Sequence, residues 1–224
     1  MKTIDIDSIV NKLAAAYPEA RCGLVFGREH ELLFAVRLSA QCTDARVNKT
    51  VPALFEAFPS LEDFARAQPR DVEAYIRPCG YHRQKARDIV LCAQRLTDVY
   101  GGRVPDTLEE LLTLPGVGRK TANLMLGELY GKPGIVADTH CIRLSGRLGL
   151  TASKDPSRVE RDLLALIPPE HQINFCHRLV LHGRAVCGAR KPDCAACALN
   201  DNCQHVLKGA DNNKALSSEE LVSK

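Results

Sequence analysis

A lysine and an aspartate, Lys120 and Asp138, are the side chains of this sequence best suited to covalent chemistry. Lys120 follows Gly116, Gly118 and Arg119, in the expected first turn of a helix. The positive end of that helix and the neighbouring guanidinium group disfavour an ammonium ion, which favours a neutral and nucleophilic amine. Asp138 supplies a carboxylate that can accept the amine's proton or stabilise a cationic intermediate. The alternative for Lys120 is an ordinary solvated lysine.

Residues 107–130 are predicted to form two helices joined by this glycine turn. Thr107 and Glu110 have the capping-box spacing that starts a helix, and Pro115 ends it. Because the turn has almost no side chains, its backbone N–H groups can approach a phosphate directly, and the next helix directs its positive end at the same anion. The alternative is that the two glycines only permit a tight turn.

Four cysteines crowd into seventeen residues near the C-terminus: Cys187, Cys194, Cys197 and Cys203. Four thiolates so close together can enclose only something compact, which predicts a metal centre. Their intervals of six, two and five residues differ from paired zinc knuckles and from a bacterial ferredoxin, and zinc remains an alternative to iron and sulfur. The first interval carries Arg190 and Lys191, a basic tip suited to phosphate contact or merely solvated.

Apolar residues recur at helical spacing along the chain, and no strand-like alternation of any length appears, so we expect an all-α fold. Outside the hairpin, the expected helices cover 6–17, 31–40, 47–58, 61–67, 70–76, 84–100, 139–148, 159–167 and 171–183.

The composition limits the possible functions. With 224 residues and 45% hydrophobic residues, the chain can bury one large core or two small ones. A net charge of +3 is only mildly basic, so any affinity for nucleic acid must come from a local patch. No apolar run is long enough to span a membrane and no signal peptide is evident, so we expect a cytoplasmic protein with no membrane partner. The six cysteines outside the C-terminal group are expected to be reduced and structural.

The segments Leu114–Lys120, Asp138–His140 and Ser39–Asp44, together with the cysteine spacing, resemble the endonuclease III family of helix-hairpin-helix DNA glycosylases. The resemblance implies two helical lobes with a DNA-binding cleft between them. Residues 22–132 would form a six-helix lobe containing the hairpin. Residues 1–21 plus 133–209 would form a lobe around one [4Fe-4S] cluster, and residues 210–224 a flexible tail.

The resemblance also implies the reaction: a bifunctional glycosylase and abasic-site lyase of base excision repair that removes oxidised pyrimidines. Lys120 would form a Schiff base and Asp138 would assist, with cleavage 3′ to the site by β-elimination. The partner would be double-stranded DNA with a damaged base or abasic site, bound by a monomer. A monovalent cation at the hairpin carbonyls is a further implied ligand. The implied DNA contacts are Gln41, Tyr81, Gly116, Gly118, Arg119, His140, Arg143, Arg190 and Lys191.

Two residues differ from the family's pattern, and two alternative functions remain. Cys42 and Arg37 depart from the family's pattern, and the role of Arg37 is open. Gln41 and Tyr81 would fill the gap left by a flipped-out nucleotide, although a capping amide and plain packing are the alternatives. One rival function is an adenine mismatch glycosylase, which would lack the hairpin lysine. The other is a DNA-binding module without enzymatic activity, in which the hairpin and the metal loop act only as clamps.

Overall fold

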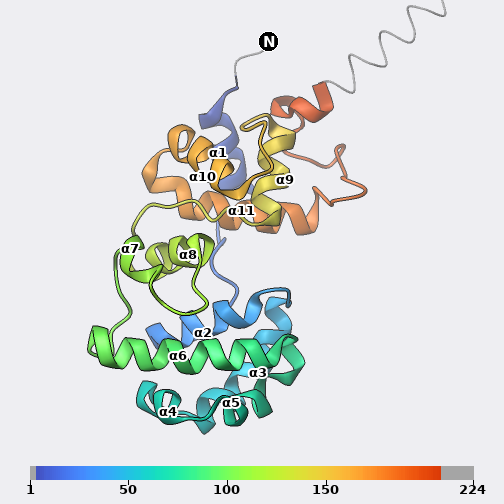
Figure 1. Ribbon diagram of the computed structural model, residues 1–224. Helices are drawn as coiled ribbons and strands as arrows, with labels where there is room; N and C mark the ends of the chain where they lie inside the picture. Colours follow the sequence, from blue (N-terminus) through green and yellow to red (C-terminus); the bar gives the residue numbers. More distant parts are fainter. Residues whose placement is uncertain (1–3, 208–224) are drawn as a thin grey trace, which may run out of the picture. The chain divides into compact units, whose positions relative to one another are not determined.

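The computed structural model describes residues 4–207, and over that range the regular structure is entirely helical (Figure 1). The expected all-α class is confirmed. The chain divides into two compact units. The middle unit is Cys22–Lys132, and the terminal unit combines the described residues on either side of it. The tail expected at 210–224 lies outside the described residues.

The middle unit contains the longest helix and the glycine hairpin. Its elements are α2 (Glu29–Ser39), α3 (Asp44–Ala57), α4 (Leu61–Arg66), α5 (Pro69–Ile76), the 3-10 turn η1 (Arg77–Cys79), α6 (His82–Tyr100), α7 (Leu108–Leu111) and α8 (Arg119–Tyr130). The terminal unit consists of α1 (Ile6–Ala16), α9 (Thr139–Leu148), α10 (Pro156–Leu166), the turn η2 (Pro169–His171), α11 (Gln172–Ala185) and the turn η3 (Asn200–Asn202).

Helix α6 is the centre of the middle unit. Figure 1 shows α4 and α5 along one side of it and α2 on the other, and all three contact it. Ala86, Ile89 and Leu96 are buried on the face of α6 that packs into the core. Next to them, Phe34 of α2 meets Phe64 of α4 edge to face, with ring centroids 4.9 Å apart. This packing gives the hairpin, which follows α6, a rigid support.

In the terminal unit, α11 packs against both α1 and α9. Helix α1 contributes Ile9, Val10 and Leu13 to a core that also contains Leu144 of α9 and Phe175 of α11. The N-terminal helix is therefore built into the same core as the segment after the hairpin, although the two are more than a hundred residues apart in sequence.

Several helix ends differ from the expected ones. Helix α6 begins at His82 because Tyr81 adopts a left-handed backbone conformation that precedes its first turn. Helix α10 begins at Pro156, three residues before the expected start at 159, because the Asp155 side chain accepts a hydrogen bond from the Arg158 N–H and caps it. Caps rather than apolar spacing decide these boundaries.

Candidate active site and cysteine centre

The two hairpin glycines serve different purposes. Gly116 has φ +76°, and a Cβ there would lie 2.8 Å from Arg37 Nε, so both its conformation and its space require glycine. Gly118 is the N-cap of α8 and would meet nothing within 4 Å. Gly118 contributes no capping side chain to the start of α8, and a helix N-terminus of this kind suits an anion. Lys120 is exposed in this first turn.

Arg37, whose role the sequence left open, packs against the hairpin at Gly116. Its Nε and Nη2 atoms donate to Asp88 Oδ2 at 2.8 and 2.5 Å, and the pair is mostly buried. Gln84 Nε2 donates to the other oxygen of Asp88 at 2.7 Å. The pair joins α2 to α6, and both of its side chains lie next to Gly116. A charged residue among the buried apolar residues of α2 is thus explained by a partner 51 positions away.

Replacing Arg37 with leucine should lower the free energy of unfolding by about 1–3 kcal/mol, because the Asp88 carboxylate would stay buried without its main donor. Urea unfolding measures this. The double variant Arg37→Leu/Asp88→Asn should regain most of the loss, since it removes the buried charge as well. Equal losses in the single and double variants would show that the pair contributes packing only.

Asp138 is the N-cap of α9. Its Oδ1 atom accepts a hydrogen bond from the Cys141 N–H at 2.7 Å, and the residue is partly exposed. This hydrogen bond to the first turn of the helix holds the carboxylate in a fixed position. One oxygen is occupied by the cap, and a carboxylate has further acceptor capacity in its second oxygen. The local structure therefore orients the Asp138 side chain.

His140 and Arg143, both predicted phosphate contacts, lie against α11. Arg143 Nη2 is 3.2 Å from His140 Nδ1 and donates to the backbone oxygens of Gly183 at 3.2 Å and Cys187 at 3.1 Å. A Cβ on Gly183 would lie 2.4 Å from His140 Nδ1. The sequence analysis missed Gly183: only a glycine on α11 leaves room for these two side chains.

The cysteine group lies entirely in the terminal unit. Cys203 is buried, while Cys187, Cys194 and Cys197 are partly buried. Burial raises the pKa of the Cys197 thiol, a backbone hydrogen bond at Leu199 lowers it, and the charges of the other three cysteines raise it further, so all four cysteines are close enough to interact. Within residues 4–207, no three Cys, His, Asp or Glu side chains are arranged around a single metal ion. Four cysteine thiols are a donor set that an iron–sulfur group can take.

Two polar side chains, Arg147 and His182, contact sulfur atoms of this group. Arg147 Nη1 donates to Cys187 Sγ at 3.0 Å, as a cation does to a thiolate or metal-bound sulfur. His182 lies between Tyr17 and Cys197: its Nδ1 is 3.0 Å from the Tyr17 hydroxyl oxygen, and its Nε2 is 3.3 Å from the Cys197 sulfur. Burial lowers the pKa of His182. A neutral ring satisfies both contacts if Nδ1 accepts from the hydroxyl and Nε2–H donates to sulfur.

Arg147 also shapes the loop between the first two cysteines. It donates to the carbonyl oxygens of Gly188 and Ala189, both at 2.8 Å. The next two residues, Arg190 and Lys191, are exposed at the tip. One side chain of α9 therefore holds the start of the basic loop that the sequence analysis identified.

Replacing Arg147 with methionine should weaken binding to an abasic-analogue duplex by about tenfold, or roughly 1.4 kcal/mol, because the basic tip loses its anchor. Fluorescence anisotropy at two salt concentrations measures this, and the salt dependence should become shallower. Arg161→Met, which removes an exposed arginine on α10, is the matched control. Unchanged affinity in the Arg147 variant would show that the loop does not bind DNA.

Gln41 and Tyr81 both belong to the middle unit. Gln41 is exposed just beyond the end of α2, and Tyr81, 69% exposed, directly precedes α6. Both have positive φ, of +53° and +47°. The sequence analysis selected the two residues but did not predict this conformation.

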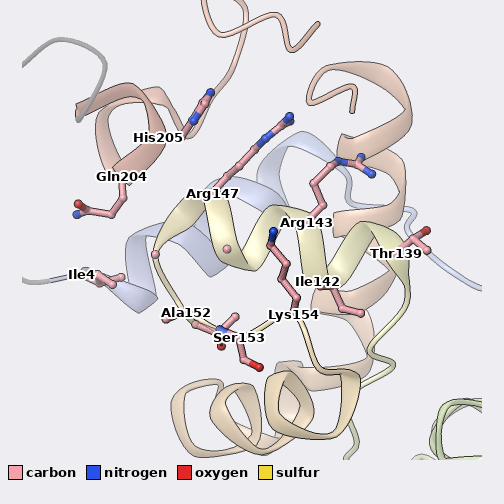
Figure 2. A pocket seen from close by; sticks show the side chains of 13 residues that line it. Ile4, Thr139, Ile142, Arg143, Arg147, Ala152, Ser153, Lys154, Gln204 and His205 are labelled. Carbon is pink, nitrogen blue, oxygen red and sulfur yellow. Dashed lines mark hydrogen bonds between the residues drawn. The ribbon is translucent and has the colours of Figure 1, made fainter. Parts of the chain in front are cut away.

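A cavity of about 940 Å³ lies along α9 in the terminal unit (Figure 2). Figure 2 shows Thr139, Arg143 and Arg147 along this helix and Lys154 reaching toward it from the loop that follows. Thr139 directly follows Asp138, so the cavity begins beside the capped end of the helix. Its three cations favour a negatively charged ligand.

Comparison with known proteins assigns the chain to a family. Residues 34–169 match the HhH-GPD superfamily base excision DNA repair protein family. The endonuclease III proteins of Synechocystis and Bacillus subtilis are 46% and 40% identical to it, over 90% and 91% of this chain and 91% and 93% of theirs. The chain belongs to the endonuclease III family. A solved structure of a trapped endonuclease III–DNA covalent intermediate is 39% identical, has a TM-score of 0.86, and covers 93% of this chain and 100% of its own.

Membership in the endonuclease III family confirms the predicted fold and the predicted class of enzyme: a base excision repair DNA glycosylase with abasic-site lyase activity. Endonuclease III proteins in general carry a [4Fe-4S] cluster, and the sulfur set described above fits that group. Among residues 4–207 no helix is long and apolar enough to cross a membrane.

Proposed function

We propose that this chain removes oxidised pyrimidines from duplex DNA and then cuts the strand 3′ to the resulting site. The observation that carries the proposal is the exposed Lys120 in the first turn of α8, beside an N-cap that has no side chain. An anion bound at that open helix end would bring a DNA backbone next to the lysine amine. The similarity to a trapped covalent endonuclease III–DNA intermediate supports the same role.

In the proposed reaction, the Lys120 amine attacks the anomeric carbon of the damaged nucleotide, and the bond to the base breaks. Asp138 accepts the proton that the amine loses, or stabilises the cationic sugar. The Schiff base that forms makes the adjacent sugar proton acidic. Solvent water takes up that proton as the bond to the 3′ phosphate breaks by β-elimination, and a second water hydrolyses the Schiff base and releases the lysine. The cap bond to Cys141 keeps Asp138 oriented throughout.

The DNA is held by contacts with its backbone and with the gap in the duplex. Gln41 and Tyr81 fill the space of the extruded nucleotide, and a lesion that stacks poorly costs less to extrude. The predicted phosphate contacts are the hairpin with Gly116, Gly118 and Arg119, then His140, Arg143, Arg190 and Lys191. None of these contacts reads base sequence, as a repair enzyme acting on scattered damage requires.

Cys187, Cys194, Cys197 and Cys203 are proposed to hold the [4Fe-4S] cluster. When bound, the cluster fixes both ends of the basic loop, and Arg147 holds the loop's first carbonyls. A monovalent cation at the hairpin carbonyls, action as a monomer and a cytoplasmic location stay predictions of the family resemblance.

A panel of duplexes tests the substrate class. One strand contains thymine glycol, 3-methyladenine, uracil or a plain abasic site, and products are separated on a denaturing gel. We expect cleavage at thymine glycol and at the abasic site, with a β-elimination end. Cleavage at the abasic site and 3-methyladenine but not at thymine glycol would contradict the substrate assignment. Binding without any cleavage would instead support the alternative of a DNA-binding module without enzymatic activity.

A further inference from the structure

Lys85 is a lysine buried to 1% exposure in the first turn of α6. Its Nζ atom donates hydrogen bonds to three backbone carbonyl oxygens, those of Leu38, Ala40 and Cys79, each at 2.8 Å. All three donor positions of an ammonium group are thus used, and no water is needed to complete them. A lysine is rarely buried without such partners.

The three carbonyls belong to the two segments that carry the predicted DNA-inserting side chains. Leu38 and Ala40 lie at the end of α2, and Gln41 follows immediately. Cys79 ends η1, two residues before Tyr81. A cation at a helix C-terminus binds carbonyls that have no partner within the helix. Here the same cation extends to a second segment, so Lys85 joins the backbone before Gln41 to the backbone before Tyr81.

Gln41 and Tyr81 also share an unusual backbone conformation. They are the two non-glycine residues with positive φ between residues 4 and 207. Residues with a side chain adopt the left-handed region at a cost in free energy, and they keep it when the surrounding structure holds them there. The bonds from Lys85 reach the residue before Gln41 and the second residue before Tyr81, whereas both side chains are exposed. The backbone is held while the side chains point outward.

We propose that Lys85 is a positioning residue for DNA insertion: its ammonium group holds the backbones that present Gln41 and Tyr81 in one geometry before DNA binds. The inference rests on the proposed function, in which these two side chains fill the gap in the duplex. Pre-forming the inserting pair avoids ordering two loops during nucleotide extrusion. An arginine, with a planar and larger head group, cannot reproduce three converging bonds from a single nitrogen.

The test uses a duplex with an uncleavable abasic analogue and 2-aminopurine opposite it, whose fluorescence reports insertion of side chains into the gap. We expect Lys85→Met to lose most of the insertion signal of the unmodified chain. Its kcat/KM on a natural abasic duplex should fall by roughly 10- to 100-fold, as for other misplaced positioning groups. Affinity for undamaged duplex should stay within about twofold, because the phosphate contacts are elsewhere.

Two further variants complete the test. Lys85→Gln keeps two N–H donors and should lie between the Met variant and the unmodified chain. Lys132→Met, which removes a lysine bonded to Asp106 in the same unit, should behave like the unmodified chain. Equal losses of insertion and of affinity for undamaged DNA would overturn the proposal, as would loss of the helical circular dichroism signal in both Lys85 variants. Turnover by the unmodified chain without any insertion signal would refute the inference but leave the proposed reaction intact.

Discussion

Replacing Lys120 with glutamine should abolish covalent trapping on DNA and lower strand cleavage by roughly 10⁴-fold or more, as when other covalent enzymes lose their nucleophile. Glutamine keeps a side chain of similar length at the start of α8 but has no amine to form a Schiff base. The hairpin glycines and the open N-terminus of α8 remain. Binding to an abasic-analogue duplex should therefore weaken by no more than about tenfold, which is the loss of one charged contact.

The matched control is Lys132→Gln, at the other end of the same helix. Lys132 lies beyond the C-terminal end of α8 and is bonded to Asp106, so its loss changes net charge equally without touching the hairpin. We expect normal trapping and cleavage. If the Lys120 variant still forms a borohydride-stable adduct, another amine is the nucleophile.

Asp138→Asn should lower kcat by roughly 10²- to 10⁴-fold, the range typical of a lost general acid or base. Asparagine caps helices about as well as aspartate, so the bond to the Cys141 N–H and the start of α9 should persist. Thermal unfolding should change little, and single-turnover kinetics on an abasic duplex measures the chemical step. The Asn variant therefore isolates the carboxylate's chemistry from its capping role.

Asp155→Ala is the complementary control, because it removes a helix cap that has no part in the chemistry. Asp155 caps α10 with a bond of 2.9 Å to the Arg158 N–H and has no part in the proposed reaction. Its loss should cost about 1 kcal/mol of stability and leave kcat unchanged. A kcat for Asp138→Asn within threefold of the unmodified chain would show that Asp138 is only a helix cap.

Local signals in the sequence predicted the helices and several caps because these depend on neighbouring residues. Thr107 accepts a hydrogen bond from the Glu110 N–H, as its spacing predicts, and Gly101 and Gly149 end their helices in the left-handed conformation. The motifs around Lys120 and Asp138 also identified the family, which the comparisons confirm.

Contacts between distant segments could not be predicted in this way. The bonds from Lys85 join residues 45 and 47 positions apart, and Arg37 pairs with Asp88 across 51. Each of these side chains looks misplaced in an apolar helix face until its partner is known. The left-handed conformation of Gln41 was equally hidden, because sequence patterns associate that conformation with glycine or asparagine. Buried polar groups of this kind need the tertiary structure to be interpreted.

Borohydride trapping followed by peptide mapping tests the central claim most directly. The unmodified chain is incubated with a thymine glycol duplex and borohydride, digested, and the cross-linked peptide is sequenced by mass spectrometry. We predict one adduct, on Lys120, with the strand cut 3′ to the lesion. An adduct on a different residue, or cleavage without any adduct, would contradict the claim that Lys120 is the nucleophile.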